Sequence, residues 1–337
     1  MQGLASLTLF HQPYDAEFHK KENIKHLSFH AYLRKVQPPS TSQSSHYPPL
    51  TPESYSVKNP CPKGGHPPWP GGICSACQPP AITLQPQPFR MVDHLEFASH
   101  DLVDRFIQAW RSTGHQRFGF MIGHYEPYEN VPMGIKAVVE AIHEPMQEGE
   151  VDGIVVPLPW EEEPRIAELS GHCSPPLCIV GQIFTDLTPL EEDKTKLLYK
   201  RHPQSFFMSS LEIILAASMQ SSHPTVSRSS PTGQFGSRFV TAIVSGAEGG
   251  GVDISSFQIS EQGCAMVAAD MIEATIVPGA MRLKEESREP GYSRYVPDVF
   301  YREKNEYGLD VKHSAKPTFP VEYLLVNVRG AKIATQR

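Results

Sequence analysis

Three stretches of the chain carry apolar residues at a spacing that is typical of helices. The first begins behind Ser99, a residue type that caps helix N-termini, and repeats apolar positions every three or four residues until Gly114. The second is predicted over residues 211–219 behind Ser209, and the third over residues 264–272. Each of them interrupts a series of shorter apolar runs.

Those shorter runs, some of them alternating with polar residues, predict β-strands. The predicted strands span residues 27–33, 82–84, 91–97, 118–122, 135–142, 178–184, 239–244, 254–259 and 321–328. The continuous apolar character of 178–184 indicates a buried strand, and the glycines at 249–251 suit a hairpin turn. Strands that are broken by helices at these intervals indicate a mixed α+β or α/β fold.

Composition divides the chain into segments of different character. We expect an N-terminal segment over 1–36, a Pro/Ser-rich loop over 37–60, a cysteine- and glycine-rich module over 61–98, and one main domain over 99–330. Within that domain, 146–177 and 284–320 are predicted to be inserted loops, the former with one short helix. The 32 prolines among 337 residues fit long irregular loops.

Charge and hydropathy exclude several classes of protein. The formal net charge is −7, whereas a protein that binds nucleic acid directly needs a basic surface. No apolar run reaches the roughly 18 residues of a membrane span. The start, Met1–Phe10, lacks the basic region and cleavage site of a signal peptide. We therefore expect a cytosolic or nuclear protein, in which Cys61, Cys74 and Cys77 are metal ligands rather than disulfide partners.

The strongest chemical signal is a group of three cysteines and one histidine, Cys61, His66, Cys74 and Cys77. A pair of thiolates two residues apart can bind one ion, and the other two side chains complete a tetrahedral set. The surrounding segment has too few apolar residues to fold unaided, so the pattern predicts one structural Zn²⁺. His30 and His46 are alternative fourth ligands, and a chance grouping of free cysteines is the simplest alternative.

A second metal site is a weaker possibility. Cys173 and Cys178 lie near His172 in the chain, but two prolines separate the thiols and no fourth ligand stands nearby. Two tryptophans, Trp69 and Trp160, fall in predicted loops, where an exposed ring can anchor a partner. For Trp69 we favour packing onto the cysteine module.

Several strings in order resemble one family, the nuclear protein localization protein 4 family, and its fungal members in particular. The matching strings are His26–Tyr32, Trp69–Pro79, Phe89–His94, Ile107–Arg111, Gly134–Ile142, Ile183–Leu187, Phe239–Thr241 and Tyr295–Asp298. The resemblance covers roughly residues 11–328. The family also carries an N-terminal ubiquitin-like domain, a first zinc finger and a longer C-terminal domain, and we expect this chain to lack them or most of them.

The resemblance implies an adaptor of the hexameric AAA ATPase segregase. Such adaptors work as a heterodimer with the ubiquitin-fusion-degradation partner protein, bind polyubiquitin, and act in ubiquitin-dependent and endoplasmic-reticulum-associated degradation. The family is also linked to nuclear transport of protein and poly(A) RNA. The implied locations are the perinuclear cytoplasm, the nucleus and its envelope, and the cytoplasmic face of the endoplasmic reticulum, where membrane contact is peripheral and made through partners.

The resemblance further implies an MPN-type (JAMM-like) domain with a mixed sheet and flanking helices. Active MPN domains hold a catalytic zinc with a His-x-His pair and an aspartate, beside a glutamate base. By resemblance, these positions fall on Phe184 and Asp186, on Glu212, and on Gln116. Phenylalanine cannot ligate a metal and glutamine has no useful basic pKa, so we expect a pseudoenzyme.

Three alternatives to an adaptor remain to be weighed. The first is an active MPN-type zinc isopeptidase, that is, a deubiquitinase. The second is a rewired metal site built from Asp186, Glu212 and a nearby histidine such as His202, although a carboxylate-rich site suits harder cations than zinc. The third is a zinc-finger nucleic-acid binder, which the net charge opposes.

Overall fold

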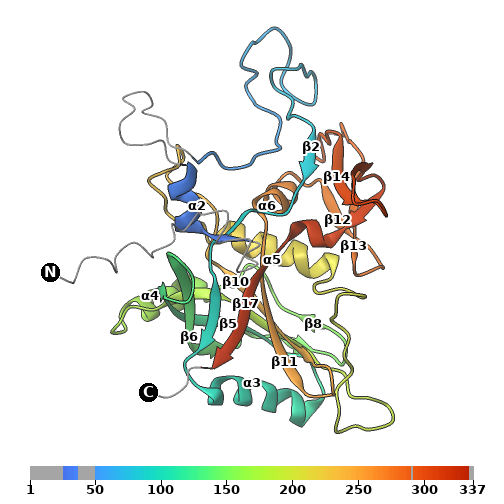
Figure 1. Cartoon of the computed structure of the whole chain (residues 1–337). Helices are drawn as coiled ribbons and strands as arrows, with labels where there is room; N and C mark the ends of the chain where they lie inside the picture. Colours follow the sequence, from blue (N-terminus) through green and yellow to red (C-terminus); the bar gives the residue numbers. More distant parts are fainter. Residues whose placement is uncertain (1–25, 37–49, 290, 334–337) are drawn as a thin grey trace, which may run out of the picture.

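The computed structural model of the chain describes residues 26–36, 50–289 and 291–333 (Figure 1). Its centre is a closed barrel of seven strands in the order β10-β11-β17-β4-β6-β5-β9. The strands are β4 (His94–Phe97), β5 (Phe118–Tyr128), β6 (Gly134–His143), β9 (Cys178–Asp186), β10 (Val240–Gly246), β11 (Val252–Ile259) and β17 (Leu325–Ile333). The sheet is mixed, because β9–β10, β17–β4 and β4–β6 are parallel and the other pairs antiparallel.

The strands β9 and β10 are joined by a long crossover that contains helix α5 (Ser210–Ser222), as a parallel pair requires. β9 is buried along almost its whole length, which agrees with its continuous apolar sequence. The two backbones approach closely at Gly181, where a Cβ atom would lie 2.0 Å from the carbonyl oxygen of Val240. A glycine is therefore required at this point of the pair.

Helix α3 (His100–Thr113) lies against the lower end of the barrel in Figure 1 and has the predicted ends. The Ser99 hydroxyl accepts from the backbone N–H of Asp101 at 3.2 Å, and Gly114 has a left-handed φ of 74°. Its apolar face packs into a core with β4 and β6; the helix residues in that core are Val103, Phe106 and Ile107. The capping residues in the sequence thus predict both ends of this helix correctly.

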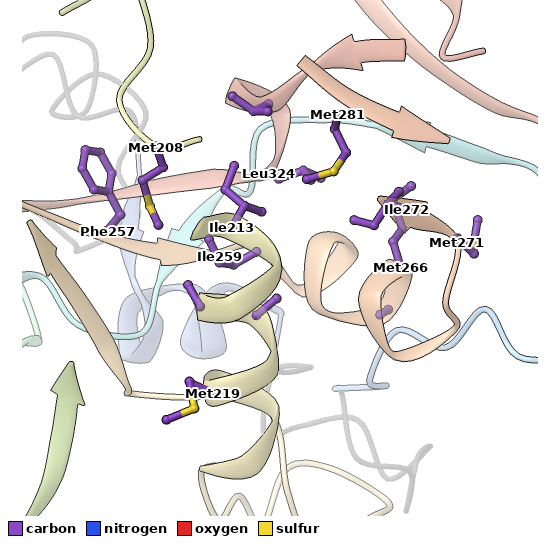
Figure 2. Close-up of a cluster of buried hydrophobic side chains, with 14 of the residues drawn as sticks. Met208, Ile213, Met219, Phe257, Ile259, Met266, Met271, Ile272, Met281 and Leu324 are labelled. Atoms are coloured by element: carbon purple, nitrogen blue, oxygen red, sulfur yellow. The ribbon is translucent and has the colours of Figure 1, made fainter. Parts of the chain in front are cut away.

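A second core lies on the other side, where α5 packs against α6 (Glu261–Ala268) and two small sheets. One sheet is β12 (Ile272–Ala274), β13 (Ala280–Leu283) and β16 (Thr318–Pro320); the other is β2 (Ile82–Leu84), β14 (Val299–Lys304) and β15 (Asp310–Ser314). Figure 2 shows this core, with Ile213 of α5 between Ile259 and Leu324, and Met266 beside Ile272. The core anchors the start of α5, which carries one of the predicted site residues.

The remaining elements are short. They are β1 (Leu27–Ser28), α2 (Phe29–Val36), β3 (Phe89–Arg90), β7 (Glu148–Gly149), β8 (Ile154–Val155), α4 (Glu163–Gly171) and the 3₁₀ helix η1 (Val321–Leu324). β1 pairs with β3, and β7 with β8. The glycine run 249–251 forms the predicted turn between β10 and β11.

The prediction of a strand over 27–33 is wrong beyond Ser28, since the chain turns there into helix α2. The Ser28 hydroxyl accepts from the backbone N–H of Ala31 at 3.4 Å, as a residue at a helix start does. Phe29, Tyr32 and Leu33 then meet one apolar cluster, a helical spacing that the alternating pattern had obscured.

The end of the predicted helix 264–272 is also wrong, because α6 stops at Ala268 and Ile272 begins strand β12. Met271 and Ile272 are buried there by β13 and the surrounding core. Likewise, η1 occupies the first half of the predicted strand 321–328, and β17 starts only at Leu325.

The prediction that 284–320 is a loop is wrong as well, since it holds β14, β15 and β16. β14 pairs in parallel with β2, whose partner residues lie more than two hundred positions earlier in the chain. Such a distant partner leaves no local pattern. The segment 146–177 has the predicted short helix, α4, and also the hairpin β7–β8.

The structure confirms a mixed α/β fold with a small cysteine and histidine cluster. Strand β4 belongs to the predicted segment 61–98 and yet lies inside the barrel, so the proposed segment limits remain a prediction. Part of the predicted loop 37–60 is described, and in it Leu50 and Tyr55 are buried. Within the described ranges, no helix is long and apolar enough to cross a membrane.

Candidate functional site

The four predicted metal ligands meet in space. Cys61, His66, Cys74 and Cys77 lie in the loop segment that precedes β2 (Figure 1), and their ligand atoms are all within 4.8 Å of one another. The sulfur atoms of Cys61 and Cys74 are 3.5 Å apart, and those of Cys74 and Cys77 are 3.8 Å apart. A tetrahedral ion with bonds of about 2.3 Å to sulfur separates two sulfurs by about 3.8 Å, so these distances fit zinc.

The imidazole of His66 is oriented for the same ion. Its Nδ1 lies 2.7 Å from the carbonyl oxygen of Pro67 and donates to it, which leaves Nε2, 3.6 Å from Cys77 Sγ, as the nitrogen that would bind an ion. Gly72 allows this arrangement, because a Cβ atom there would lie 2.9 Å from His66 Nδ1. The donor set is therefore three sulfurs and one imidazole nitrogen.

The Cys-x-x-Cys turn favours the thiolate form of its first cysteine. The backbone N–H groups of Cys77 and Gln78 both donate to the carbonyl oxygen of Cys74 and close the turn. A backbone hydrogen bond from Ala76, followed by contacts with His66 and Cys61, lowers the pKa of Cys74 to about 6. A thiolate is the form that binds metal ions, so the local backbone prepares the site for a cation.

The module rests on the segment that precedes β14. The ring of Trp69 meets that of Tyr295 edge-on at 5.9 Å between centroids, and the guanidinium of Arg288 lies 5.2 Å from the Trp69 ring. The printed ring contacts of Trp69 are thus with the segment that precedes β14, and packing of this ring onto the cysteine module stays a prediction. Trp160 is buried and stacks on Phe120 at 4.2 Å, so it is a core residue and the idea of an exposed anchor is wrong for it.

The alternative metal ligands do not join a cluster. Over residues 26–36, 50–289 and 291–333, just one group of three or more Cys, His, Asp or Glu side chains gathers its ligand atoms, and it is the group described above. His30 lies elsewhere, in a pocket beside Arg238, and His46 falls outside the described residues. The group of His172, Cys173 and Cys178 therefore forms no second site of this kind.

The four positions that the resemblance assigns to a catalytic centre line one pocket of about 460 Å³. Gln116 and Phe184 form its inner wall, and Asp186 and Glu212 stand at the end of β9 and the start of α5. The structure thus brings together residues that are up to 96 positions apart (212 − 116). Its remaining walls are mostly apolar and include Ile154, a residue of β8.

Every hydrogen-bonding group of the Gln116 side chain is occupied. Its Oε1 accepts from the hydroxyl of Thr185 at 2.7 Å and from the backbone N–H of Leu187 at 3.1 Å. Its Nε2 donates to the carbonyl oxygens of Val151 at 2.7 Å and Leu187 at 2.8 Å. An amide saturated in this way holds the end of β9 in place and has no group left to activate water.

Arg201 joins the two carboxylates of the pocket. Its Nε donates to Asp186 Oδ2 at 2.9 Å, and its Nη atoms make a bidentate pair with Glu212 at 2.9 and 2.7 Å. Its side chain is only 4% exposed, and Lys200 Nζ adds a bond to Asp186 Oδ1 at 2.9 Å. A cation of the protein itself therefore neutralises this pair of acids.

The charges on this pocket support the same interpretation. Burial opposes ionisation of Asp186, but Arg201 and Lys200 outweigh it and lower the pKa of that carboxyl below its ordinary value. Phe184 is buried and lies 5.9 Å from the Arg201 guanidinium. His202 contacts Gln204 instead. Among the described residues, Asp186, Glu212 and His202 do not bring their ligand atoms together as a metal site would.

The sequence interpretation missed Arg201 and Lys200. A signal for them was present, because two carboxylates predicted at a strand end and a helix start need a counter-charge when they are buried. The chain between those elements contains an adjacent lysine and arginine. Whether these two side chains reach the carboxylates depends on the conformation of the loop between β9 and α5, and the sequence does not predict that conformation.

Comparison with known proteins covers nearly the whole chain. Residues 117–336 match the model described as "NPL4 family", and residues 2–114 match "NPL4 family, putative zinc binding region". Nuclear protein localization protein 4 of Yarrowia lipolytica is 46% identical over 97% of this chain and 58% of its own length. The proteins of that name from Saccharomyces cerevisiae and Schizosaccharomyces pombe are 47% and 45% identical over 94% of the chain and 54% of theirs.

The chain therefore spans about half the length of the curated relatives it matches. The matched region described as "putative zinc binding region", residues 2–114, contains the cluster of Cys61, His66, Cys74 and Cys77. The match to both family models, together with identity near 46% across the chain, has one conclusion: this protein belongs to the NPL4 family.

Proposed function

We propose that this protein is a non-catalytic adaptor that recruits polyubiquitinated substrates to the hexameric AAA ATPase segregase, in a heterodimer with the ubiquitin-fusion-degradation partner. Family membership supports this role. The same proposal assigns the barrel and its helices to the MPN type, and assigns Gln116, Phe184, Asp186 and Glu212 to the degenerate remains of a catalytic centre. The locations stated above, at the nucleus and the endoplasmic reticulum, follow from the same family role.

The observation that carries the proposal is the ion pair of Arg201 with Asp186 and Glu212. A hydrolytic zinc needs neutral imidazoles, a free carboxylate and an open position for water. Here both carboxylates are used by one guanidinium, and a phenyl ring, Phe184, lies beside them. Metal-assisted cleavage of an isopeptide bond would require that this ion pair be broken first, at a cost of several kcal/mol for buried charges.

The zinc module completes the proposal as a structural element. Cys61, His66, Cys74 and Cys77 supply four protein ligands to one Zn²⁺, so no open position is left for a substrate or for water. Zinc bound there stabilises a loop that has few apolar residues of its own. This is the part of the chain that we assign to docking on the ATPase.

The proposal predicts that the protein retains ubiquitin chains without cutting them. Purified protein on beads is incubated with ubiquitin chains of the degradation-signalling linkage, with and without added zinc, and bound and released material is resolved by gel. We expect intact chains in the bound fraction and no shorter products. The isopeptidase alternative predicts shorter chains, and a nucleic-acid binder predicts chains that are neither bound nor cut.

The variant Glu212→Gln distinguishes activity of this pocket from contamination. Any trimming that the wild type shows and E212Q lacks would come from this site and would overturn the assignment as a pseudoenzyme. Trimming that persists in the variant has another source. Failure to retain chains in either protein, with a normal melting temperature, would instead refute the adaptor role of this chain.

A further inference from the structure

A separate pocket of about 390 Å³ lies between helix α2, the β5–β6 hairpin and Arg238, two residues before β10. His30 comes from α2, Tyr125 and Met133 from the hairpin region, and Arg238 from the approach to β10. It shares no lining residue with the pocket of Gln116 and Asp186. Its function is not accounted for by the zinc module or the degenerate centre.

Arg238 has no acidic partner. No carboxylate of the part of the chain that the structure describes lies within 4.0 Å of it, and its Nε is buried with no hydrogen-bond acceptor. The guanidinium lies 5.6 Å from the centre of the Tyr125 ring, which holds it in place. Arg238 as a whole is only half-buried and lines the pocket, so a ligand that carries an anionic acceptor could pair with its guanidinium there.

Among the groups around Arg238, Arg34 adds positive charge, whereas His30 contributes a ring that its surroundings keep uncharged. His30 also lines the pocket, and burial together with the charge of Arg238 lowers its pKa. Arg34 lies one turn further along α2 and directs Nη1 toward Met133 Sδ at 3.9 Å. Glu126 is the acidic residue in the lining, and its carboxylate pairs with Lys136 Nζ at 2.8 Å. It therefore does not neutralise the positive charge of Arg238.

The wall opposite the guanidinium is apolar. Met133 is 40% exposed and adopts a left-handed φ of 57°, an uncommon conformation for a side chain of this kind. Ile135 and Pro127 continue the same wall. A ligand that carries a carboxylate beside an aliphatic group would therefore be complementary to both the guanidinium and the apolar wall of the pocket.

We propose that this pocket is a docking site for an acidic peptide segment of a partner protein. A carboxylate of the segment accepts hydrogen bonds from Arg238, and a neighbouring aliphatic side chain packs on Met133. Nucleic acid fits less well, because a chain of phosphates would pass the carboxylates of Glu126 and Glu140 on the adjoining strands. A peptide can instead place a single charge between apolar neighbours.

The test observes the pocket directly in the full chain. Protein labelled with ¹³C at methionine methyl groups is titrated with a blocked pentapeptide of alternating leucine and aspartate, and the Met133 signal is assigned from a Met133→Leu spectrum. We expect a saturable shift of that signal. The matched peptide with asparagine in place of aspartate should bind at least about tenfold more weakly, since it loses charge-assisted hydrogen bonds.

Two variants complete the test. Arg238→Gln should remove the Met133 shift. Arg282→Gln, at an exposed arginine of β13 that pairs with Glu273 of β12, should leave the shift unchanged. Equal shifts from the aspartate and asparagine peptides in the wild type would overturn the proposal whether or not the variants fold. So would a shift that survives in R238Q, or stronger competition by a single-stranded thymidine oligonucleotide, which would indicate nucleic acid.

Discussion

A single side chain, Arg201, determines the chemistry of the pocket at the end of β9. Its guanidinium supplies five N–H donors in a planar fork, and two carboxylates and the carbonyl oxygen of Phe207 accept from them. A metal ion in the same place would have used the acids and still offered an open coordination position. The guanidinium neutralises the same negative charge but offers no coordination position for water or substrate.

Replacement of Arg201 tests how strongly the pocket depends on that charge. Arg201→Met keeps the length of the side chain but leaves Asp186 and Glu212 beside each other without their main partner. We expect a loss of about 2–4 kcal/mol in the free energy of unfolding, since removal of one member of a buried ion pair is costly. Urea denaturation followed by circular dichroism measures it.

Lys200→Met is the matched control. Lys200 contacts the same Asp186, but its side chain is 29% exposed, so its loss should cost less than about 1 kcal/mol. Equal effects of the two variants would show that Arg201 has no special role in the pocket.

The family resemblance predicted the four degenerate positions, but it did not predict the residues that contact them. Phe184 and Gln116 could be judged unsuited to catalysis from their chemistry alone. The partners that saturate the Gln116 side chain come from two other segments of the chain, one with Val151 and one with Thr185 and Leu187. Chemistry is thus a property of the residue, whereas satisfaction of its hydrogen bonds is a property of the fold.

Elements with strong local end signals were predicted well. Helix α5 begins with a capping box, in which the Ser209 hydroxyl accepts from the Glu212 N–H at 3.3 Å and Glu212 Oε2 accepts from the Ser209 N–H at 2.7 Å. The same carboxylate also binds Arg201, so a helix cap doubles as a wall of the pocket. Helix α2 was mistaken for a strand because eight residues are too few for a clear periodicity.

The cysteine module is an element whose structure should depend on its metal. The variant Cys74→Ser removes a ligand from the centre of the cluster, and we expect the protein to lose its zinc, about one ion per chain, and to melt at a lower temperature. Metal content by mass spectrometry and a thermal melt give the two measurements.

Cys173→Ser serves as the control for that variant, because Cys173 is an exposed free thiol outside the cluster. It should retain zinc and melt as the wild type does. A Cys74→Ser protein with unchanged zinc content would refute the ligand assignment, and zinc that is lost without any change in melting would refute its structural role.

At the scale of the whole molecule, Asp93 lies where the barrel is closed by β4. Its side-chain Oδ2 accepts a hydrogen bond from the backbone N–H of Ile135 at 3.0 Å. Its backbone carbonyl oxygen accepts one from the backbone N–H of Arg329 at 3.1 Å, so Asp93 joins β6 and β17. Its side chain is 1% exposed, and Arg90 Nε stays 3.5 Å away. Burial, which this distant partner offsets only in part, raises the pKa of Asp93 to about 6.

The raised pKa has a definite sign for stability. The folded state holds the Asp93 proton up to about pH 6, whereas the unfolded state releases it near the ordinary value of 3.8. Stability from this group is therefore greatest at low pH and falls as the pH rises between these two values. Relative to Asp93→Asn, the wild type should lose about 1 kcal/mol of unfolding free energy between about pH 5 and pH 7.

Urea denaturation of both proteins across that pH range measures the difference. Asparagine keeps an oxygen that can accept from Ile135, so the variant should fold and show a flatter dependence on pH. Parallel curves for the two proteins, or a wild type that gains relative stability as the pH rises, would contradict the assignment of a buried and poorly compensated carboxyl.

Neighbours along the chain were sufficient to predict the ends of α3 and α5, the buried strand β9 and the spacing of the four zinc ligands, and the ordered matching strings indicated the family. Which distant segments meet depended on the three-dimensional fold. It paired β14 with β2, put Arg201 between Asp186 and Glu212, and left Arg238 beside His30 without an acid. Caps and turns are satisfied within a few residues, whereas strand partners and buried ion pairs depend on the topology and register of the whole chain.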